Sequence, residues 1–336
     1  MSNEQFDLNW VQNYGYTYIK SAQRRDLTPA SRLAAMSRLV NQYFRIGLDL
    51  LFDGTYMWLL SGFGLNRIDV QTNQTGFISI QGGRQLAFDG NNIWMIINQH
   101  DSSTIWIVDP TSNLKTHEFP CYAGDHGPHD IVFDGHRMWV TFFSSDTLRI
   151  YSTVEPYEEL QSINLPGART RICFDGRNVW IAGNDEVVIR SPSDPLVDVA
   201  RITLDGPPEK MIFDGWRVWV DCHDYSEHKQ KLIAFSAQEF EPTSQVVEIA
   251  EGYVNYATDL CYDGRFIWLC HPESYVQKFN PWIDSMQIRP AWWCGVGLSP
   301  RAMAFDGSHI WVAHWGSPTI SRIPAFPSPG FYSPPL

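Results

Sequence analysis

Residues 127–140 read GPHDIVFDGHRMWV. The centre of this stretch is an aromatic residue followed by Asp-Gly, three variable residues and Trp, and this pattern occurs seven times in the 336-residue chain. The aromatic residues are Phe52, Phe88, Phe133, Phe174, Phe213, Tyr262 and Phe305, and the tryptophans are Trp58, Trp94, Trp139, Trp180, Trp219, Trp268 and Trp311. Successive repeats lie 36, 45, 41, 39, 49 and 43 residues apart, which is the period of β-propeller blades made of four short strands.

The residues around each repeat predict strands joined by tight turns. Asp-Gly is a hairpin signal because Gly tolerates the positive φ that such turns need. Strand-like runs flank it, as at residues 85–88 and 92–96, and two further runs follow in each repeat. One large flat side chain per blade would fill the wedge against the next blade, so we expect the seven tryptophans to be buried. The sequence therefore predicts an all-β fold, a single seven-bladed β-propeller with four-stranded blades over residues 46–323.

The two ends of the chain have different patterns. Residues 1–45 contain Tyr14, Tyr16 and Tyr18 in strand-like alternation, and we expect a strand near residues 14–20 to complete the seventh blade and cover its open edge. Thr28-Pro29 then starts a predicted short helix with apolar residues at helical spacing up to Phe44. This helix is either a packed connector or lies across one end of the propeller. Residues 324–336 form a Pro-rich tail.

Composition excludes several classes of function. Lys and Arg number 25 against 37 Asp and Glu, and a net charge of −12 argues against nucleic-acid binding. No run of 18 apolar residues predicts a membrane span. The polar N-terminus and six cysteines without a CxxC motif predict a cytoplasmic protein with free thiols. The absence of a P-loop, a nucleophile elbow and a dinucleotide fingerprint argues against phosphoryl and hydride transfer.

The candidate functional residues follow from their register within the repeat. In a propeller the loops before the innermost strand and after the Trp strand converge on one face around the axis. The position four residues before the repeat aromatic is occupied in different blades by Arg84, His129, Glu209 and Arg301. The position three residues before it is occupied by Asp130, Arg171, Lys210 and Asp259. The position three residues after the repeat Trp is occupied by Cys222, His271 and His314. The aromatic, Asp-Gly and Trp positions carry the same residue type in every blade. The loop positions carry different residues in different blades, and most of these residues are ionisable. We therefore expect a binding or catalytic centre on this face.

The residue types suggest a role for each group. Histidines beside carboxylates suit proton transfer, so His129, His271, His314 and Glu209 are the candidate catalytic residues. The candidate substrate-binding residues are Arg84, Asp130, Arg171, Lys210, Asp259, Arg301 and Trp315. We expect no cofactor, although a divalent metal ion held by Glu209, Cys222, His271 and His314 is an alternative. A rim of hydrogen-bonded polar side chains that binds no metal is the other interpretation.

The repeat at residues 127–140 resembles those of the streptogramin (virginiamycin B) lyase superfamily, and the resemblance extends over residues 46–323. It implies a seven-bladed propeller in which a histidine in the Pro-x-x-Ile motif and a glutamate three residues after the Trp hold magnesium and assist an elimination. His129 matches that histidine. Phe142 replaces the glutamate in the same blade, while His271 and His314 occupy the glutamate position in their own blades and Glu209 occupies the histidine position.

Two functions are therefore compatible with the sequence. The first is a lyase, isomerase or cyclase that acts on a small molecule, for example in tailoring a natural product. The second is a non-catalytic propeller that binds a ligand or a partner protein, because fold does not determine function. An enzyme would gather the rim residues within hydrogen-bond reach in a pocket, whereas a protein-binding module would expose a broad apolar patch.

Overall fold

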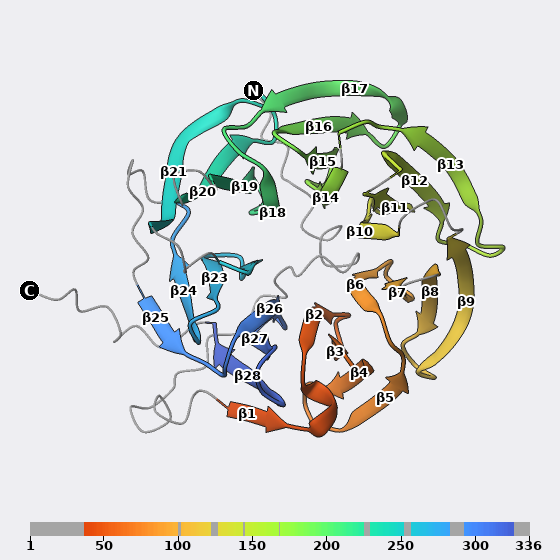
Figure 1. Cartoon of the computed structure of the whole chain (residues 1–336), viewed down its shortest axis with the longest axis vertical. Coiled ribbons are helices and arrows are strands. Elements are labelled where there is room, and N and C mark those ends of the chain that lie inside the picture. The colour runs from red at the N-terminus through yellow and green to blue at the C-terminus, as the bar shows by residue number, and fades with distance from the viewer. Residues whose placement is uncertain are drawn as a thin grey trace, which may run out of the picture.

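The computed structural model describes residues 37–99, 102–121, 127–143, 145–167, 169–224, 229–251, 257–282 and 292–325. Seven antiparallel four-stranded sheets stand around a common axis in these residues (Figure 1). The predicted all-β, seven-bladed propeller is therefore confirmed. Within the described residues, no helix is long and apolar enough to cross a membrane.

The blades are numbered along the chain, and each is given from its innermost strand outward. Blade 1 contains β2 (Gly47–Phe52), β3 (Tyr56–Ser61), β4 (Gly64–Asp69) and β5 (Thr75–Ser79). Blade 2 contains β6 (Gly83–Phe88), β7 (Ile93–Asn98), β8 (Ser103–Asp109) and β9 (Leu114–Cys121). Blade 3 contains β10 (Pro128–Phe133), β11 (Arg137–Phe142), β12 (Thr147–Ser152) and β13 (Glu159–Asn164). Blade 4 contains β14 (Arg169–Phe174), β15 (Val179–Gly183), β16 (Glu186–Ser191) and β17 (Asp194–Thr203).

The remaining three blades follow the same order. Blade 5 contains β18 (Pro208–Phe213), β19 (Arg217–Asp224), β20 (Lys229–Ser236) and β21 (Pro242–Glu251). Blade 6 contains β22 (Asp259–Tyr262), β23 (Ile267–His271), β24 (Tyr275–Phe279) and β25 (Trp292–Gly295). Blade 7 contains β26 (Pro300–Phe305), β27 (His309–His314) and β28 (Thr319–Pro324), with β1 (Ser37–Val40) as its outermost strand.

An N-terminal strand closes the last blade, but it is not the predicted segment. Strand β1 pairs antiparallel with β28, from Ser37 opposite Arg322 to Val40 opposite Thr319. Residues 14–20 lie outside the described residues. The helix predicted up to Phe44 is wrong for the part described, where β1 is followed only by the 3-10 turn η1 (Gln42–Phe44). The free backbone groups on the edge of β28 favour strand pairing over the local helical period.

A hydrogen bond between Trp and Asp repeats in every blade and builds the core. All seven repeat tryptophans are fully buried, as predicted. Each indole Nε1 donates to the Oδ2 of the Asp in its own Asp-Gly turn, with N–O distances of 2.6–2.8 Å. The other carboxylate oxygen accepts the backbone N–H groups two and three residues after the Asp. The following Gly has a φ of +86° to +97°, as the turn requires.

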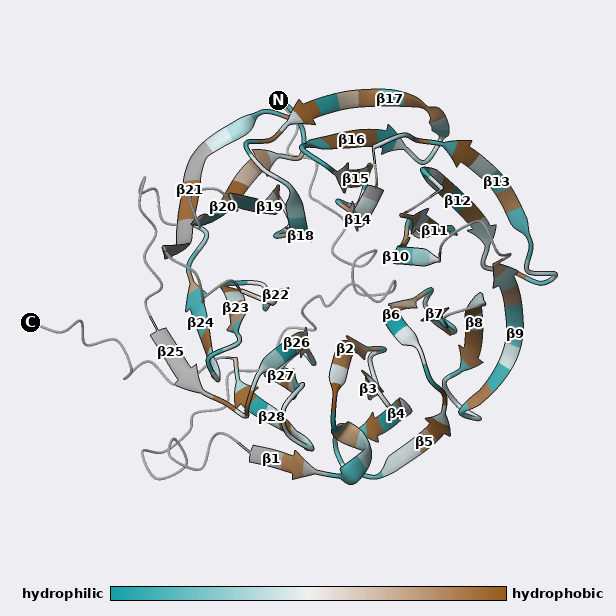
Figure 2. Ribbon diagram, viewed as in Figure 1, coloured by the Kyte–Doolittle hydropathy of each residue, from teal (hydrophilic) through white to brown (hydrophobic). Residues whose placement is uncertain are grey.

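Each tryptophan also packs against the inner strand of the next blade. Trp139 shares a core cluster with Ile172 and Phe174 of blade 4, and Trp219 shares one with Tyr262 of blade 6. Figure 2 shows hydrophobic residues along the middle strands of the blades, while β6, β10 and β18 carry hydrophilic residues near the axis. The core therefore lies between the blades, and the polar residues gather at the centre of the ring.

Replacing Trp180 separates the hydrogen bond from the packing. Trp180→Phe keeps an aromatic ring but leaves the buried Asp175 without its indole donor, so we expect the free energy of unfolding to fall by about 1–3 kcal/mol. Trp180→Ala also removes the ring and should cost about 3–5 kcal/mol. Urea unfolding followed by circular dichroism measures both values. A Phe variant as stable as the native protein would show that the hydrogen bond contributes nothing.

Closure by β1 is tested by two truncations. A chain that begins at Asn41 lacks β1 and exposes the edge of β28, so we expect a melting temperature lower by several degrees and aggregation in size-exclusion chromatography. A chain that begins at Ala35 keeps β1 and is the matched control. Equal melting temperatures for the two chains would contradict closure by β1.

Candidate functional site

The inner strands of the seven blades begin at one end of the propeller, which we call the rim face. The strand registers place the first residues of each inner strand opposite the last residues of the second strand, for example Pro128 opposite Phe142. The positions three residues before the repeat aromatic form one level around the axis, which we call the axial ring. Its members are Asp49, Gln85, Asp130, Arg171, Lys210, Asp259 and Ala302.

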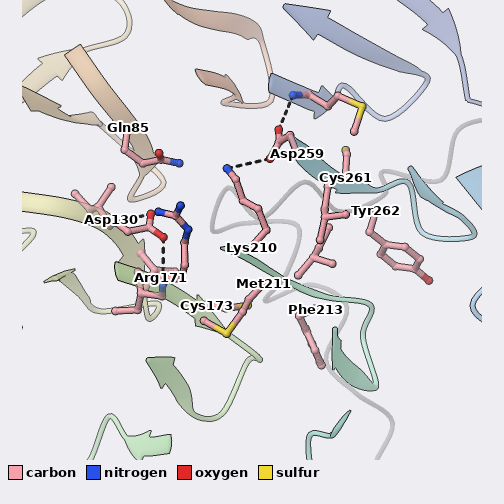
Figure 3. Close-up of a pocket in the computed structure, with 16 residues that line it drawn as sticks. Gln85, Asp130, Arg171, Cys173, Lys210, Met211, Phe213, Asp259, Cys261 and Tyr262 are labelled. Atoms are coloured by element: carbon pink, nitrogen blue, oxygen red, sulfur yellow. Dashed lines mark hydrogen bonds and ion pairs between the residues drawn. The ribbon is translucent and has the colours of Figure 1, made fainter. Parts of the chain in front are cut away.

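A cavity of about 230 Å³ opens at the axial ring and extends along the axis. Gln85, Asp130, Arg171, Lys210 and Asp259 line its polar part. Figure 3 shows Lys210 extending from β18 toward Asp259, with Asp130 and Arg171 on its other side. The structure thus brings four of the predicted substrate-binding residues to one cavity.

Three aspartates of the axial ring join neighbouring blades. Asp49 accepts a hydrogen bond from the backbone N–H of Leu86 at 2.7 Å, Asp130 from Ile172 at 3.1 Å, and Asp259 from Met303 at 2.7 Å. In each case the donor belongs to the inner strand of the next blade. These carboxylates therefore have a structural function in addition to any contact with a ligand.

Lys210 is the central cation of the cavity. Its Nζ lies 3.1 Å from Asp259 Oδ1. Burial lowers the pKa of Lys210, but the carboxylates of Asp259, Asp49 and Asp130 outweigh burial and leave that pKa above its ordinary value. Lys210 is therefore an ammonium ion at neutral pH.

The same balance raises the pKa of two ring carboxyl groups. Burial raises the pKa of Asp49 to about 7, against the lowering effect of Lys210 and with a further rise from Asp259. Burial also raises the pKa of Asp130, although Arg171 and Lys210 oppose it. Lys210 and Arg171 are thus the cations that partly offset the effect of burial on these two carboxyl groups.

One level above the ring, His129 lies between two arginines. Its Nε2 accepts from Arg84 Nη2, and its Nδ1 donates to the backbone oxygen of Thr170 at 2.6 Å. Burial, together with Arg84 and Arg171, lowers the pKa of His129 to about 3. His129 is therefore neutral at physiological pH, and both of its ring nitrogens are engaged.

Arg171, in blade 4, is bonded to Glu209 of blade 5. Its Nε donates to the backbone oxygen of Glu209, and its Nη2 lies 3.1 Å from Glu209 Oε2. The predicted catalytic Glu209 is thus held in an ion pair beside the cavity.

Arg84 and Arg301 are solvent-exposed cations on the rim face. Within the part of the chain that the structure describes, neither forms an ion pair with a carboxylate. Partial burial and the charges of Arg171 and Arg301 lower the pKa of Arg84. Near the mouth of the cavity, Arg84 and Arg301 are therefore the cations without an ion-pair partner among the described carboxylates, although the charge of Asp130 favours the charged form of Arg84.

His271 and His314 do not line this cavity, although the sequence predicted them at the mouth. Both are buried. His314 Nε2 accepts from the backbone N–H of Gly297 at 3.0 Å, and its Nδ1 lies 2.6 Å from the backbone oxygen of Thr319. His271 stacks on Tyr275 with ring centroids 4.5 Å apart. The contacts with Thr319 and Tyr275 hold both side chains against residues of their own blades.

The alternative metal site does not form in the described residues, where no group of three His, Cys, Asp or Glu side chains could hold a metal ion. Glu209 pairs with Arg171, and burial raises the pKa of Cys222 to about 12, which disfavours the thiolate that a metal needs. The magnesium implied by the lyase resemblance also does not match this rim, because arginines flank His129 and Phe142 carries no ligand atom.

Exposed aromatic and apolar side chains surround the charged centre on the rim face. Trp315 is 48% exposed, and its backbone is hydrogen-bonded to Ser299 beside the exposed Leu298. Phe63 and Phe143 are also exposed, and the Phe143 ring lies 6.0 Å from that of His129. Of these side chains, only Trp315 was predicted from the sequence. Phe143 stands at the same position, four residues after the repeat Trp, which is the signal that would have identified it.

Comparison with known proteins supports the fold alone. No protein-family model matches the chain, and no curated protein matches it in sequence. Among solved structures, a chain of a mitotic checkpoint complex has a TM-score of 0.69 at 10% identity, covering 92% of this chain and 98% of its own. Virginiamycin B lyase from Staphylococcus aureus has a TM-score of 0.65 at 13% identity, covering 87% and 99%. The Myceliophteria thermophila Cps50 (Swd1) propeller has a TM-score of 0.65 at 8% identity, covering 87% and 100%.

The raised pKa of Asp49 predicts a pH-dependent stability. The folded protein keeps this proton up to about pH 7, whereas the unfolded chain loses it near 3.8, so the stability from Asp49 is largest below pH 4 and declines as the pH rises to 7. Between pH 5 and 8 the native protein should therefore lose roughly 2–3 kcal/mol relative to Asp49→Asn. Urea unfolding at several pH values measures this difference, with the exposed Asp194→Asn as control. A constant difference would contradict the shift.

Proposed function

We propose that this propeller binds a small organic anion at the mouth of the axial cavity and acts on it as a lyase, isomerase or cyclase. The observation that carries the proposal is the group of cations at this mouth. Arg84 and Arg301 are exposed without a carboxylate partner among the described residues, and Arg171 and Lys210 lie beside them. The chain as a whole has a net charge of −12, so two exposed arginines without an ion-pair partner stand out.

Electrostatics favours an anion at this place. Burial lowers the pKa values of both Arg84 and His129, and neighbouring positive groups lower them further, so part of each shift reflects repulsion between the cations. A carboxylate or similar group between the guanidinium groups would relieve that repulsion and accept charge-assisted hydrogen bonds. The positive charge at the mouth of the cavity would also attract such a ligand from solution.

The axial ring contains groups suited to proton chemistry on such a substrate. Lys210, kept protonated by Asp259, would stabilise an oxyanion that develops in the reaction. Asp130 lines the cavity and burial raises its pKa, which suits a carboxyl group that takes up and returns a proton. His129 would orient the guanidinium of Arg84 rather than transfer a proton, because both of its nitrogens are engaged. Fold similarity to a lyase is compatible with this assignment.

A second candidate function is binding of a partner protein on the rim face. The exposed side chains of Phe63, Phe143, Leu298 and Trp315 favour it, because aromatic residues beside arginines are common at the centres of protein interfaces. The small-molecule proposal has priority because it also accounts for the cavity and the cluster of cations.

Isothermal titration with benzoate, hexanoate, citrate and phosphate tests the proposal, with benzamide and hexanamide as neutral counterparts. We expect at least one anion to bind, no amide to bind, and affinity to fall as NaCl is added. The double variant Arg84→Gln/Arg301→Gln should bind at least tenfold more weakly. Arg177→Gln/Arg265→Gln removes the same charge from two exposed arginines in Asp-Gly turns and should change affinity little. Absence of binding for all four anions would contradict the proposal.

A further inference from the structure

We infer that the ligand of the axial cavity is a monocarboxylate with one apolar tail, bound with its carboxylate at the rim face and its tail along the axis. This inference rests on the proposed function and specifies the class of molecule. It follows from a change in the chemistry of the lining residues with depth, from their burial, and from the volume of the cavity.

The inner strands change from polar to apolar at the same depth. In β18, Glu209 and Lys210 are followed by Met211, Ile212 and Phe213. The cavity lining shows the same change in three further strands, from Asp130 to Ile131 and Val132, from Arg171 to Ile172 and Cys173, and from Asp259 to Leu260 and Cys261. With a rise of about 3.3 Å per residue, the apolar part from Lys210 to Phe213 spans roughly 10 Å.

No charged side chain lines this deeper part of the cavity among the described residues. Burial raises the pKa of the Cys173 and Cys261 thiols, so both are neutral. A second charge on the ligand would lose its hydration there without gaining a partner. Dicarboxylates and zwitterions with a charged far end are therefore disfavoured, whereas a hydrocarbon tail meets matching surfaces.

The burial of the lining residues shows where a tail would make contact. Cys173, Cys261, Phe213 and Met303 retain 4–6% of their surface exposed, whereas the repeat tryptophans retain none. Since the cavity is lined by these four residues, their remaining exposure is available to its contents. A tail would cover this apolar surface, and burying it contributes to affinity in proportion to its area.

The volume sets a limit on the tail. An apolar cavity of about 150 Å³ holds benzene, so 230 Å³ accommodates a phenyl group with a short linker or an alkyl chain of similar size. Ordered water needs two to four polar partners, and the deeper lining offers few. A tail would therefore displace weakly held water.

Isothermal titration with acetate, butanoate, hexanoate, octanoate and decanoate tests the inference, and phenylacetate and 3-phenylpropanoate distinguish an aromatic tail from an aliphatic one. We expect affinity to rise about fourfold for each added methylene and to stop rising when the cavity is full. Arg84→Gln should weaken binding of every acid by the same factor, because it acts on the carboxylate alone.

Two variants of the lining should move the optimal tail length in opposite directions. Ile212→Ala enlarges the cavity and should favour longer acids, while Cys261→Met shortens it and should favour shorter ones, with little change for acetate. Val188→Ala, a buried residue outside the cavity, is the control and should leave the optimum unchanged. Anion binding that is independent of tail length would overturn this inference and leave the proposed function standing. Failure of every acid, together with citrate and phosphate, to bind would overturn both.

Discussion

The hydrogen bond from each repeat Trp to the Asp of its own Asp-Gly turn is the interaction on which the rest of the propeller depends. The Asp carboxylate is shared between the turn and the indole, so it fixes the turn and the wedge-filling ring in one geometry. Because this unit recurs in all seven blades, every inner strand reaches the axis at the same depth. Residues three positions before the aromatic therefore meet in one ring, although they are separated by about 40 residues in the chain.

The axial ring serves the fold as well as the candidate site. Asp49, Asp130 and Asp259 accept backbone N–H groups from the next blade, and Lys210 is paired with Asp259. Much of the polarity at the axis thus joins neighbouring blades. What remains for a ligand is the excess of positive charge at the mouth, where Arg84 and Arg301 have no described carboxylate partner. The positions that join the blades therefore lie only one residue away, along the inner strands, from the positions of Arg84 and Arg301 that we propose to bind the ligand.

The repeat predicted the fold, the seven buried tryptophans and the residues that meet in the axial ring, because each depends on a local pattern repeated at a fixed register. Non-local pairing could not be predicted in the same way. Strand β1 was expected as part of a helix, since its pairing with β28 joins residues nearly 300 positions apart. His271 and His314 were expected at the mouth, but strand neighbours and Gly297 enclose them. The raised pKa of Asp49 and the engagement of His129 by two arginines depend on side chains from several blades, which no single segment specifies.

The central claim is that the mouth of the cavity binds a carboxylate and the axis receives its tail. A crystal structure of the protein grown with 3-phenylpropanoate tests this claim most directly. We expect the carboxylate between the guanidinium groups of Arg84 and Arg301 and the phenyl ring beside Ile212 and Cys261. A cavity that contains only water at saturating ligand, or a ligand bound with its ring outward, would contradict it.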